Sequence, residues 1–179
     1  MILVFDTTAL SHFARAGRLD ALEQVTAGFR RVVPEVVLGE ILGGVAEHPA
    51  LGAIGGCTWF EIVDLDDIAE TMAFATYVSE FDPTGVRHAG EAAVLSWARL
   101  HNAIAIVDDR TATYAAQRDR IEVHGTLWLI VNGYVTRALK REEAEEIVDR
   151  LLETDMRLPV DSGKALFAWA YGEGLLPPS

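Results

Sequence analysis

Cysteine is almost absent from the sequence, with Cys57 as the single one among 179 residues. One cysteine cannot form a disulfide within the chain, and it cannot supply a zinc cluster built from cysteines. Disulfides belong to oxidising compartments, so their absence favours a cytoplasmic location. Half of the residues are hydrophobic, which suits one globular domain. We place this domain at residues 1–175 and a short tail at 176–179.

Long hydrophobic runs are missing as well. No stretch approaches the roughly 18 apolar residues of a membrane helix. The N-terminus enters an apolar segment at once, without the basic region and the small-residue cleavage site of a secretory signal. We therefore expect neither a membrane segment nor a targeting signal.

Positive charge is scarce, since 15 lysines and arginines stand against 27 acids and the net charge is −12. This excess of acid argues against binding of nucleic acid through bulk electrostatic attraction. Residues 61–82 and 142–155 are rich in acids, in a pattern typical of solvated helix faces. Arginines are spread through the first two thirds of the chain, which is compatible with a basic rim around an acidic pocket.

The most informative stretch is residues 103–111, AIAIVDDRT. Its small and apolar residues predict a buried strand of a parallel sheet that ends on two adjacent acids, Asp108 and Asp109. Adjacent carboxylates repel each other and are costly to desolvate, so they need a cation, a proton or exposure. Ligands of open α/β sheets bind at the carboxyl ends of the strands, which favours a metal. For this stretch alone, an Asp that only caps the following helix is an equally good interpretation.

The N-terminus repeats this arrangement. Residues 1–8, MILVFDTT, predict an apolar strand that ends on Asp6 and is followed by two hydroxyl residues that can begin a helix. If both strands lie in one parallel sheet, their ends share an edge, and the acids converge there.

Two predicted helices add one acid each. In the helix that follows Pro34, Glu40 lies on a largely apolar face, where a half-buried carboxylate needs a partner. In the helix predicted over residues 88–100, Glu91 heads an apolar stripe that packs on the sheet. The helix dipole alone would also favour an acid in this first turn.

Strand and helix patterns alternate along the whole chain. The alternation predicts a three-layer α/β/α sandwich with a mostly parallel central sheet and right-handed crossovers. The five acids would then meet at the C-terminal edge of this sheet. Thr126 precedes a long predicted helix, and we interpret it as the helix cap in preference to a hydroxyl that faces the site.

Five segments carry a resemblance to a known family: VFDTTAL, VVPEVVLGEI, GEAAVLSWA, AIVDDRTA and HGTLWLIVNGYV. In this order and spacing they resemble the PIN-domain ribonucleases, and particularly the branch whose final motif carries an Asp-Asp-Arg run and a Gly-Thr-Leu helix start. The resemblance covers about residues 1–175.

The resemblance implies a metal-dependent ribonuclease, commonly the toxin of a VapBC-type toxin-antitoxin pair. RNA would be the substrate, a cognate antitoxin the partner, and a homodimer the usual assembly. Mg²⁺ or Mn²⁺ would neutralise the charge that builds up on the phosphodiester and lower the pKa of the attacking water. The implied catalytic and metal-binding residues are Asp6, Glu40, Glu91 and Asp109, with Asp108 as an added metal ligand.

The chain departs from the family pattern at one point. Many members carry a further Asp one turn into the helix of the third motif, where this chain has Val94 and Leu95. A site with one metal ion, or an inactive site, is therefore conceivable.

Two other interpretations stay open. A catalytically impaired PIN-like domain could act as a binding module, pairing with itself, an antitoxin or RNA through helices such as residues 8–15 and 19–25. A receiver-like phosphorylation domain can also open on Ile-Val-Asp-Asp. It fits less well because the acid pair stands at position 108 and only Lys140 and Lys164 could serve as its lysine.

Overall fold

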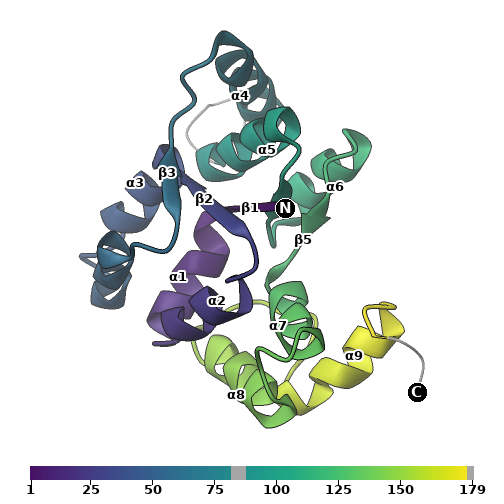
Figure 1. Cartoon of the computed structure of the whole chain (residues 1–179). Helices are drawn as coiled ribbons and strands as arrows, with labels where there is room; N and C mark the ends of the chain where they lie inside the picture. Colours follow the sequence, from purple (N-terminus) through teal and green to yellow (C-terminus); the bar gives the residue numbers. More distant parts are fainter. Residues whose placement is uncertain (82–87, 177–179) are drawn as a thin grey trace.

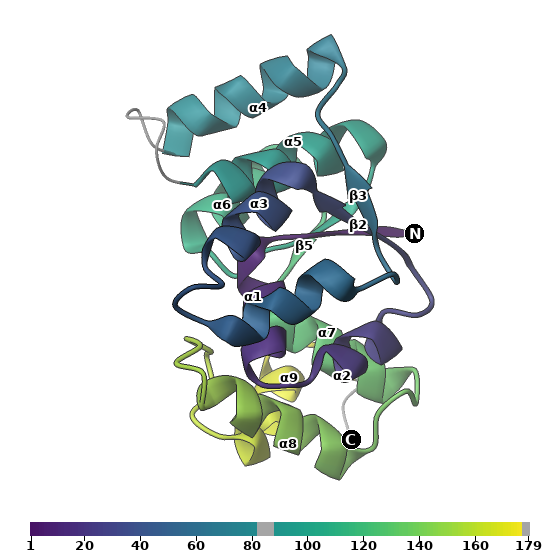
Figure 2. The same cartoon turned by 90° about the vertical axis from the view of Figure 1, so that its left-hand side faces the viewer.

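A parallel sheet forms the centre of the computed structural model, which describes residues 1–81 and 88–176 (Figure 1). Its five strands follow the order β3-β2-β1-β4-β5, and all their pairings are parallel. Helices cover both faces of the sheet, as the second view also shows (Figure 2). The predicted three-layer α/β/α sandwich is thereby confirmed. The strands are β1 (Ile2–Phe5), β2 (Arg30–Pro34), β3 (Glu61–Val63), β4 (Ile104–Ile106) and β5 (Val123–His124).

The helices alternate with the strands, as the sequence pattern predicts. Two short 3-10 helices, η1 (Pro49–Gly56) and η2 (Gly163–Ala165), join the longer elements. The α-helices of the described residues are α1 (Thr7–Arg15), α2 (Leu19–Val25), α3 (Glu35–Gly43), α4 (Ile68–Phe81), α5 (Ala89–His101), α6 (Arg110–Arg118), α7 (Thr126–Val135), α8 (Arg141–Leu152) and α9 (Leu166–Gly172).

The central strands are buried on both faces because helices cover the sheet from either side. Every residue of β4 is buried, and so are Leu3, Val4 and Phe5 of β1. Phe5 pairs with Ile106, and the Asp6 N–H donates to the Ile106 carbonyl over 3.1 Å. The chain therefore leaves β1 and β4 at the same edge of the sheet, which brings two of the predicted acidic segments together.

Helices α1 and α2 have their apolar faces in the core. Leu10 and Phe13 of α1, like Leu22 and Val25 of α2, are almost fully buried. These buried faces are therefore not available to a partner, and any contact through α1 or α2 would use their exposed sides.

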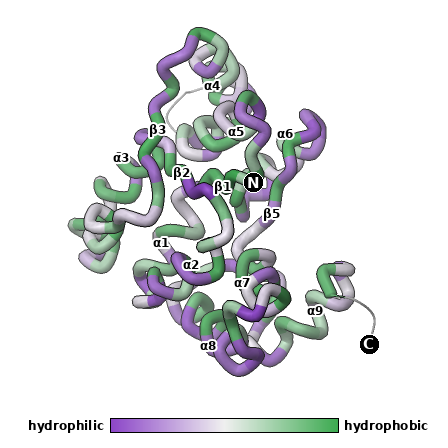
Figure 3. The backbone as a smooth tube through the Cα atoms, in the orientation of Figure 1, coloured by the Kyte–Doolittle hydropathy of each residue, from purple (hydrophilic) through white to green (hydrophobic). Residues whose placement is uncertain are grey.

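Hydropathy follows the layers of the fold. Helix α7 is mostly hydrophobic and the outer end of α6 is hydrophilic (Figure 3). Leu176 is 6% exposed and belongs to the hydrophobic core, whereas residues 177–179 of the expected tail lie outside the described residues. None of the helices in the described part combines the length and the apolar character of a membrane span.

Candidate metal centre

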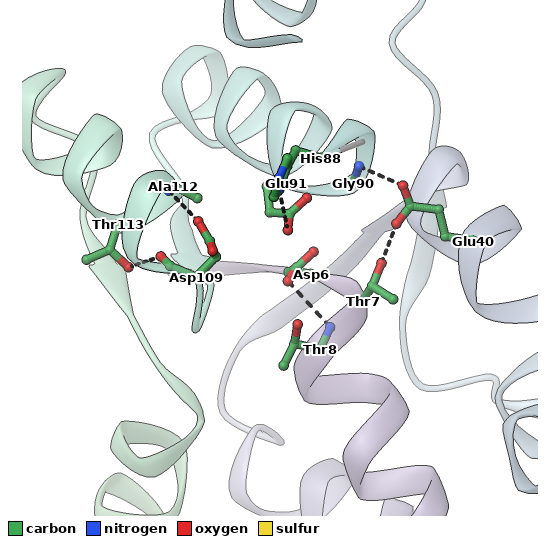
Figure 4. A network of polar contacts seen from close by, with 10 residues as sticks. All are labelled: Asp6, Thr7, Thr8, Glu40, His88, Gly90, Glu91, Asp109, Ala112 and Thr113. Carbon is green, nitrogen blue, oxygen red and sulfur yellow. Dashed lines mark hydrogen bonds and ion pairs between the residues drawn. The ribbon is translucent and has the colours of Figure 1, made fainter. Parts of the chain in front are cut away.

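Four carboxylates gather at the C-terminal edge of the sheet. Asp6 follows β1, Asp109 lies between β4 and α6, Glu91 belongs to the first turn of α5, and Glu40 comes from α3. The carboxylate of Glu91 points toward Asp6, with Asp109 on one side and Glu40 on the other (Figure 4). The fifth predicted acid, Asp108, turns to a different partner.

Asp6 is the most constrained of these acids. It is 1% exposed, and its carboxylate accepts one long hydrogen bond, 3.4 Å, from the Thr8 N–H at the start of α1. Burial and the nearby charge of Glu91 raise the pKa of Asp6 from 3.8 to about 7. Its Oδ1 is buried and has no hydrogen-bond partner among the described residues. An ionised carboxylate in this position lacks the partners that its burial requires.

Glu91 is held from its own helix. The ring Nδ1 of His88 lies 3.3 Å from Glu91 Oε1, and the Glu91 side chain is 18% exposed. His88 precedes α5 with a positive φ of 64°, the left-handed conformation that non-glycine residues rarely adopt. The spacing of His88 and Glu91 was visible in the sequence, but nothing there indicated this backbone conformation.

Glu40 is exposed, and the prediction of a half-buried carboxylate is wrong. The side chain reaches away from the apolar face of α3 to polar partners on two other helices. Its carboxylate accepts from the Thr7 hydroxyl over 2.7 Å and from the Gly90 N–H over 2.9 Å. A Cβ atom at Gly90 would lie 2.5 Å from Glu40 Oε2, so a larger residue there would displace this carboxylate. Sequence reasoning missed both partners because they are distant along the chain.

Asp108 and Asp109 diverge, and each binds the start of a helix. Asp109 Oδ1 accepts from the Ala112 N–H over 2.9 Å and so caps α6. Asp108 accepts from the Thr126 N–H over 2.9 Å and from the Thr126 hydroxyl over 2.6 Å. Burial raises the pKa of Asp108, and the two bonds from Thr126 oppose this rise.

The interpretation of Thr126 as a helix cap is wrong. Gly125 precedes α7 in the capping position, and Thr126 is the first residue of the helix. The acceptor that the free N–H groups of α7 require comes from Asp108, 18 residues earlier in the chain. Asp108, in the segment after β4, therefore caps α7 in place of the Thr126 side chain that the sequence suggested.

A pocket of about 320 Å³ opens beside these acids. Its walls bring three of the predicted acids, Glu91, Asp108 and Asp109, together with residues that sequence reasoning did not single out, including Arg157. It is lined by Thr8, His12, Glu91, Asp108, Asp109, Asp155, Met156 and Arg157. A larger pocket of about 390 Å³ lies at the opposite edge of the sheet, near Met1 and Ile104, away from the predicted acids.

The donor set suits a hard divalent cation, which prefers carboxylate oxygens. Among residues 1–81 and 88–176, no three histidine, cysteine or acidic side chains are close enough together to hold one ion. The acids therefore lie around a possible ion position but are too far apart to coordinate one ion together in this conformation. The unpartnered, buried Oδ1 of Asp6 is the observation that fits a cation best, since the described residues offer that oxygen nothing else.

Val94 and Leu95 leave no room for a further acid on α5. Both are fully buried and belong to the hydrophobic core. The second turn of α5 therefore belongs to the core, and the acid that α5 contributes to the candidate site is Glu91 in its first turn.

Comparison with known proteins identifies the family. The model of the PIN domain family matches residues 2–167. The chain belongs to the PIN-domain family. Members of this family are in general nucleases. No curated protein matches this PIN domain.

A solved structure supports the fold of the PIN domain. A chain in the crystal structure of VapBC2 from Rickettsia felis bound to a DNA fragment from their promoter aligns with a TM-score of 0.52 and 16% identity. The alignment covers 70% of this chain and 98% of that chain. At this identity the likeness concerns the fold alone.

We predict that, without a bound ion, the free energy of unfolding of the wild type rises relative to that of the Asp6→Asn variant as the pH falls. The carboxyl of Asp6 binds its proton more tightly in the folded than in the unfolded protein. Protonation of Asp6 therefore contributes fully to the stability below pH 3.8, and this contribution is lost as the pH rises through about 7. Between pH 7 and pH 5 the stability gap should change by about 2 kcal/mol, at most ~1.4 kcal/mol per pH unit. Urea unfolding in the presence of a chelator measures it, and a gap independent of pH would contradict the raised pKa.

We further predict that Mn²⁺ stabilises the wild type and not Asp6→Asn. A ligand that binds only the folded state at 100 times its Kd adds about 2.7 kcal/mol, or roughly 5–10 °C in Tm for a chain of this size. Thermal unfolding with and without Mn²⁺ tests this. An equal shift in both proteins would mean that the ion binds elsewhere.

Proposed function

We propose that this PIN domain is a metal-dependent endoribonuclease, the toxin of a VapBC-type toxin-antitoxin pair in the cytoplasm. The carrying observation is the Asp6 carboxylate, which is buried beside Glu91 with an unpartnered oxygen in a domain of a nuclease family. Two neighbouring acids, one of them buried with an unpartnered oxygen, are reasonable if a cation lies between them in the working state.

Mg²⁺ or Mn²⁺ would be held by Asp6, Glu91 and Asp109, with Glu40 and Asp108 at the margins. When bound, the ion would neutralise charge on the phosphodiester and lower the pKa of the attacking water. Glu40 is engaged by Thr7 and Gly90, and Asp108 by Thr126, so both act chiefly by fixing the elements around the site. Asp109 keeps one oxygen outside its capping bond for this purpose.

The substrate must approach an acidic protein, so local positive charge is needed. Arg157 is exposed and lines the pocket that contains Glu91, Asp108 and Asp109. Within the described residues it forms no ion pair. A guanidinium in this place suits a phosphate group of the RNA that lies next to the scissile bond.

The second candidate function is a binding module without catalysis. The specific observation in its favour is the core position of Val94 and Leu95, where many family members have an acid. The partners would be an antitoxin or a second copy of the chain. A homodimer is also our proposal for the nuclease, and the exposed Ile68 and Met72 on α4 suit such a contact.

We predict that substitution of any one of the acids of the site causes a similar, severe loss of RNA cleavage. Asp6→Asn, Glu91→Gln and Asp109→Asn should each lower Mn²⁺-dependent cleavage of single-stranded RNA by about 100-fold or more, because each removes a ligand of the same ion. Glu40→Gln should also reduce cleavage severely, because an amide cannot accept both from the Thr7 hydroxyl and from the Gly90 N–H and so no longer fixes α1 and α5 around the site. Gel assays give the rates, and circular dichroism shows whether each variant folds.

Two controls accompany this series. Asp108→Asn should reduce cleavage less and should lower the stability by about 1 kcal/mol, because it weakens one of the two bonds to Thr126. Glu142→Gln, on an exposed position of α8, should change neither rate nor stability. If the folded wild type cleaves no RNA and arrests no growth, the binding-module function replaces the nuclease.

We also predict that a cognate antitoxin inserts an arginine among these acids. The neighbouring structure is that of VapBC2 with promoter DNA, which supports an antitoxin partner for this chain as a proposal. A guanidinium pairs well with carboxylates and would exclude both metal and RNA. Co-purification with the product of the adjacent gene tests the partner. Equal binding by an Asp6→Asn, Asp109→Asn double variant would place the contact elsewhere.

A further inference from the structure

One histidine of the pocket is held in a defined tautomer. His12 Nδ1 lies 2.6 Å from the hydroxyl of Thr154, and this hydroxyl lies 2.6 Å from the Leu151 carbonyl oxygen. A carbonyl carries no proton, so the single hydroxyl proton is donated to Leu151. Both contacts are hydrogen bonds only if His12 Nδ1 is protonated and donates to Thr154. The neutral ring then has its lone pair on Nε2.

His12 Nε2 is open to the pocket. Within the described residues Nε2 has no hydrogen-bond partner, and the one buried side-chain polar atom there that lacks a partner is Asp6 Oδ1. Nε2 thus keeps a free lone pair within the described part of the chain, on the side of the ring away from Thr154. His12 lines the pocket together with Thr8, Glu91 and Asp109.

The ring is also neutral near pH 7. Burial lowers the pKa of His12, the charges of Arg15 and His48 lower it further, and Asp155 opposes them. A neutral ring with a protonated Nδ1 can only accept a hydrogen bond at Nε2. Such a lone pair can also bind a metal ion, but in the described part of the chain His12 belongs to no group of three histidine, cysteine or acidic side chains that could hold one. The hydrogen-bonding group that it binds must therefore be a donor.

The backbone of RNA offers one kind of donor. Phosphate oxygens, ester oxygens and the ring oxygen of ribose only accept hydrogen bonds, whereas the 2′-hydroxyl also donates. We propose that His12 Nε2 accepts a hydrogen bond from a ribose 2′-hydroxyl next to the scissile phosphate, so that His12 distinguishes RNA from DNA.

This inference rests on the ribonuclease proposal and adds a specificity-determining residue to the same site. Thr154 is the positioning residue, because it fixes the tautomer of His12 and the orientation of its ring. Thr154 is itself 7% exposed, and it belongs to the segment after α8 that also brings Asp155 and Arg157 to the pocket. The contact between His12 and Thr154 spans 142 residues of sequence.

A double-substitution cycle between protein and RNA tests the proposal. The substrates are a short single-stranded RNA that the wild type cleaves and the same RNA with a single 2′-deoxy nucleotide at each position beside the cleaved bond. His12→Asn keeps an amide near the place of Nδ1 and removes the acceptor at Nε2. His12→Gln instead puts an amide oxygen near the place of Nε2.

The wild type should lose about 3- to 10-fold in cleavage at one 2′-deoxy position, the effect of one hydrogen bond. His12→Asn should lose the same factor on RNA and nothing more on the 2′-deoxy substrate, and His12→Gln should recover part of the preference. Binding of the same oligonucleotides with Ca²⁺ in place of Mn²⁺, followed by fluorescence anisotropy, should show the same pattern without catalysis. Thr154→Val retains the ring and frees its tautomer, so it should halve the preference or reduce it further.

The matched control is His101→Asn, at an exposed position outside the pocket, which should leave the preference for RNA unchanged. An equal effect of His12→Asn on RNA and 2′-deoxy substrates would overturn the proposal and assign His12 to the attacking water or to the fold. A wild type that binds Mn²⁺ but neither binds nor cleaves RNA would defeat the ribonuclease proposal together with this one. If the wild type cleaves RNA but the effects of the His12 substitution and of the 2′-deoxy nucleotide are independent, the role of His12 is contradicted and the ribonuclease proposal stands.

Discussion

The burial of one carboxylate, Asp6, is the constraint on which the candidate site depends. Strand β1 lies in the middle of the sheet and is covered on both faces, so the residue that follows it remains inside the protein. Its charge meets Glu91 and receives one long hydrogen bond from Thr8. Desolvation and repulsion together disfavour the ionised form, and a cation would remove both penalties at once. The rest of the site is arranged around this position.

Helix starts hold the surrounding acids. Asp6 binds the first turn of α1, Asp109 that of α6 and Asp108 that of α7, while Glu40 binds the first turn of α5. The free N–H groups and the partial positive charge at a helix start favour a carboxylate there. Each contact therefore stabilises a helix and fixes an acid at the same time. The N–H groups of the helix starts thus offset part of the repulsion between the carboxylates, and several like charges can lie near one another in the ion-free protein.

Local patterns in the sequence were sufficient to predict the layers of the fold and the convergence of the acids. The apolar runs before Asp6 and Asp108 predict buried parallel strands, and such strands end at one edge. The details that failed depend on contacts between distant residues. Glu40 finds its partners on α1 and α5, and Thr126 meets Asp108 across 18 residues. No periodicity or spacing could have indicated His12, since its ring is fixed by Thr154, 142 residues further on.

The acids and the other pocket residues have different origins in the chain. Asp6 and Asp109 follow central strands and Glu91 lies in the first turn of a helix that packs on the sheet. The core limits what these positions can become, as the buried Val94 and Leu95 illustrate. Arg157 and Thr154 come from the segment after α8, and His12 from the side of α1 that meets this segment. A change in that segment would alter the charge and the hydrogen-bonding groups of the pocket without disturbing the strand ends. In the proposed ribonuclease, selection among RNA substrates could therefore vary independently of the framework that would bind the metal.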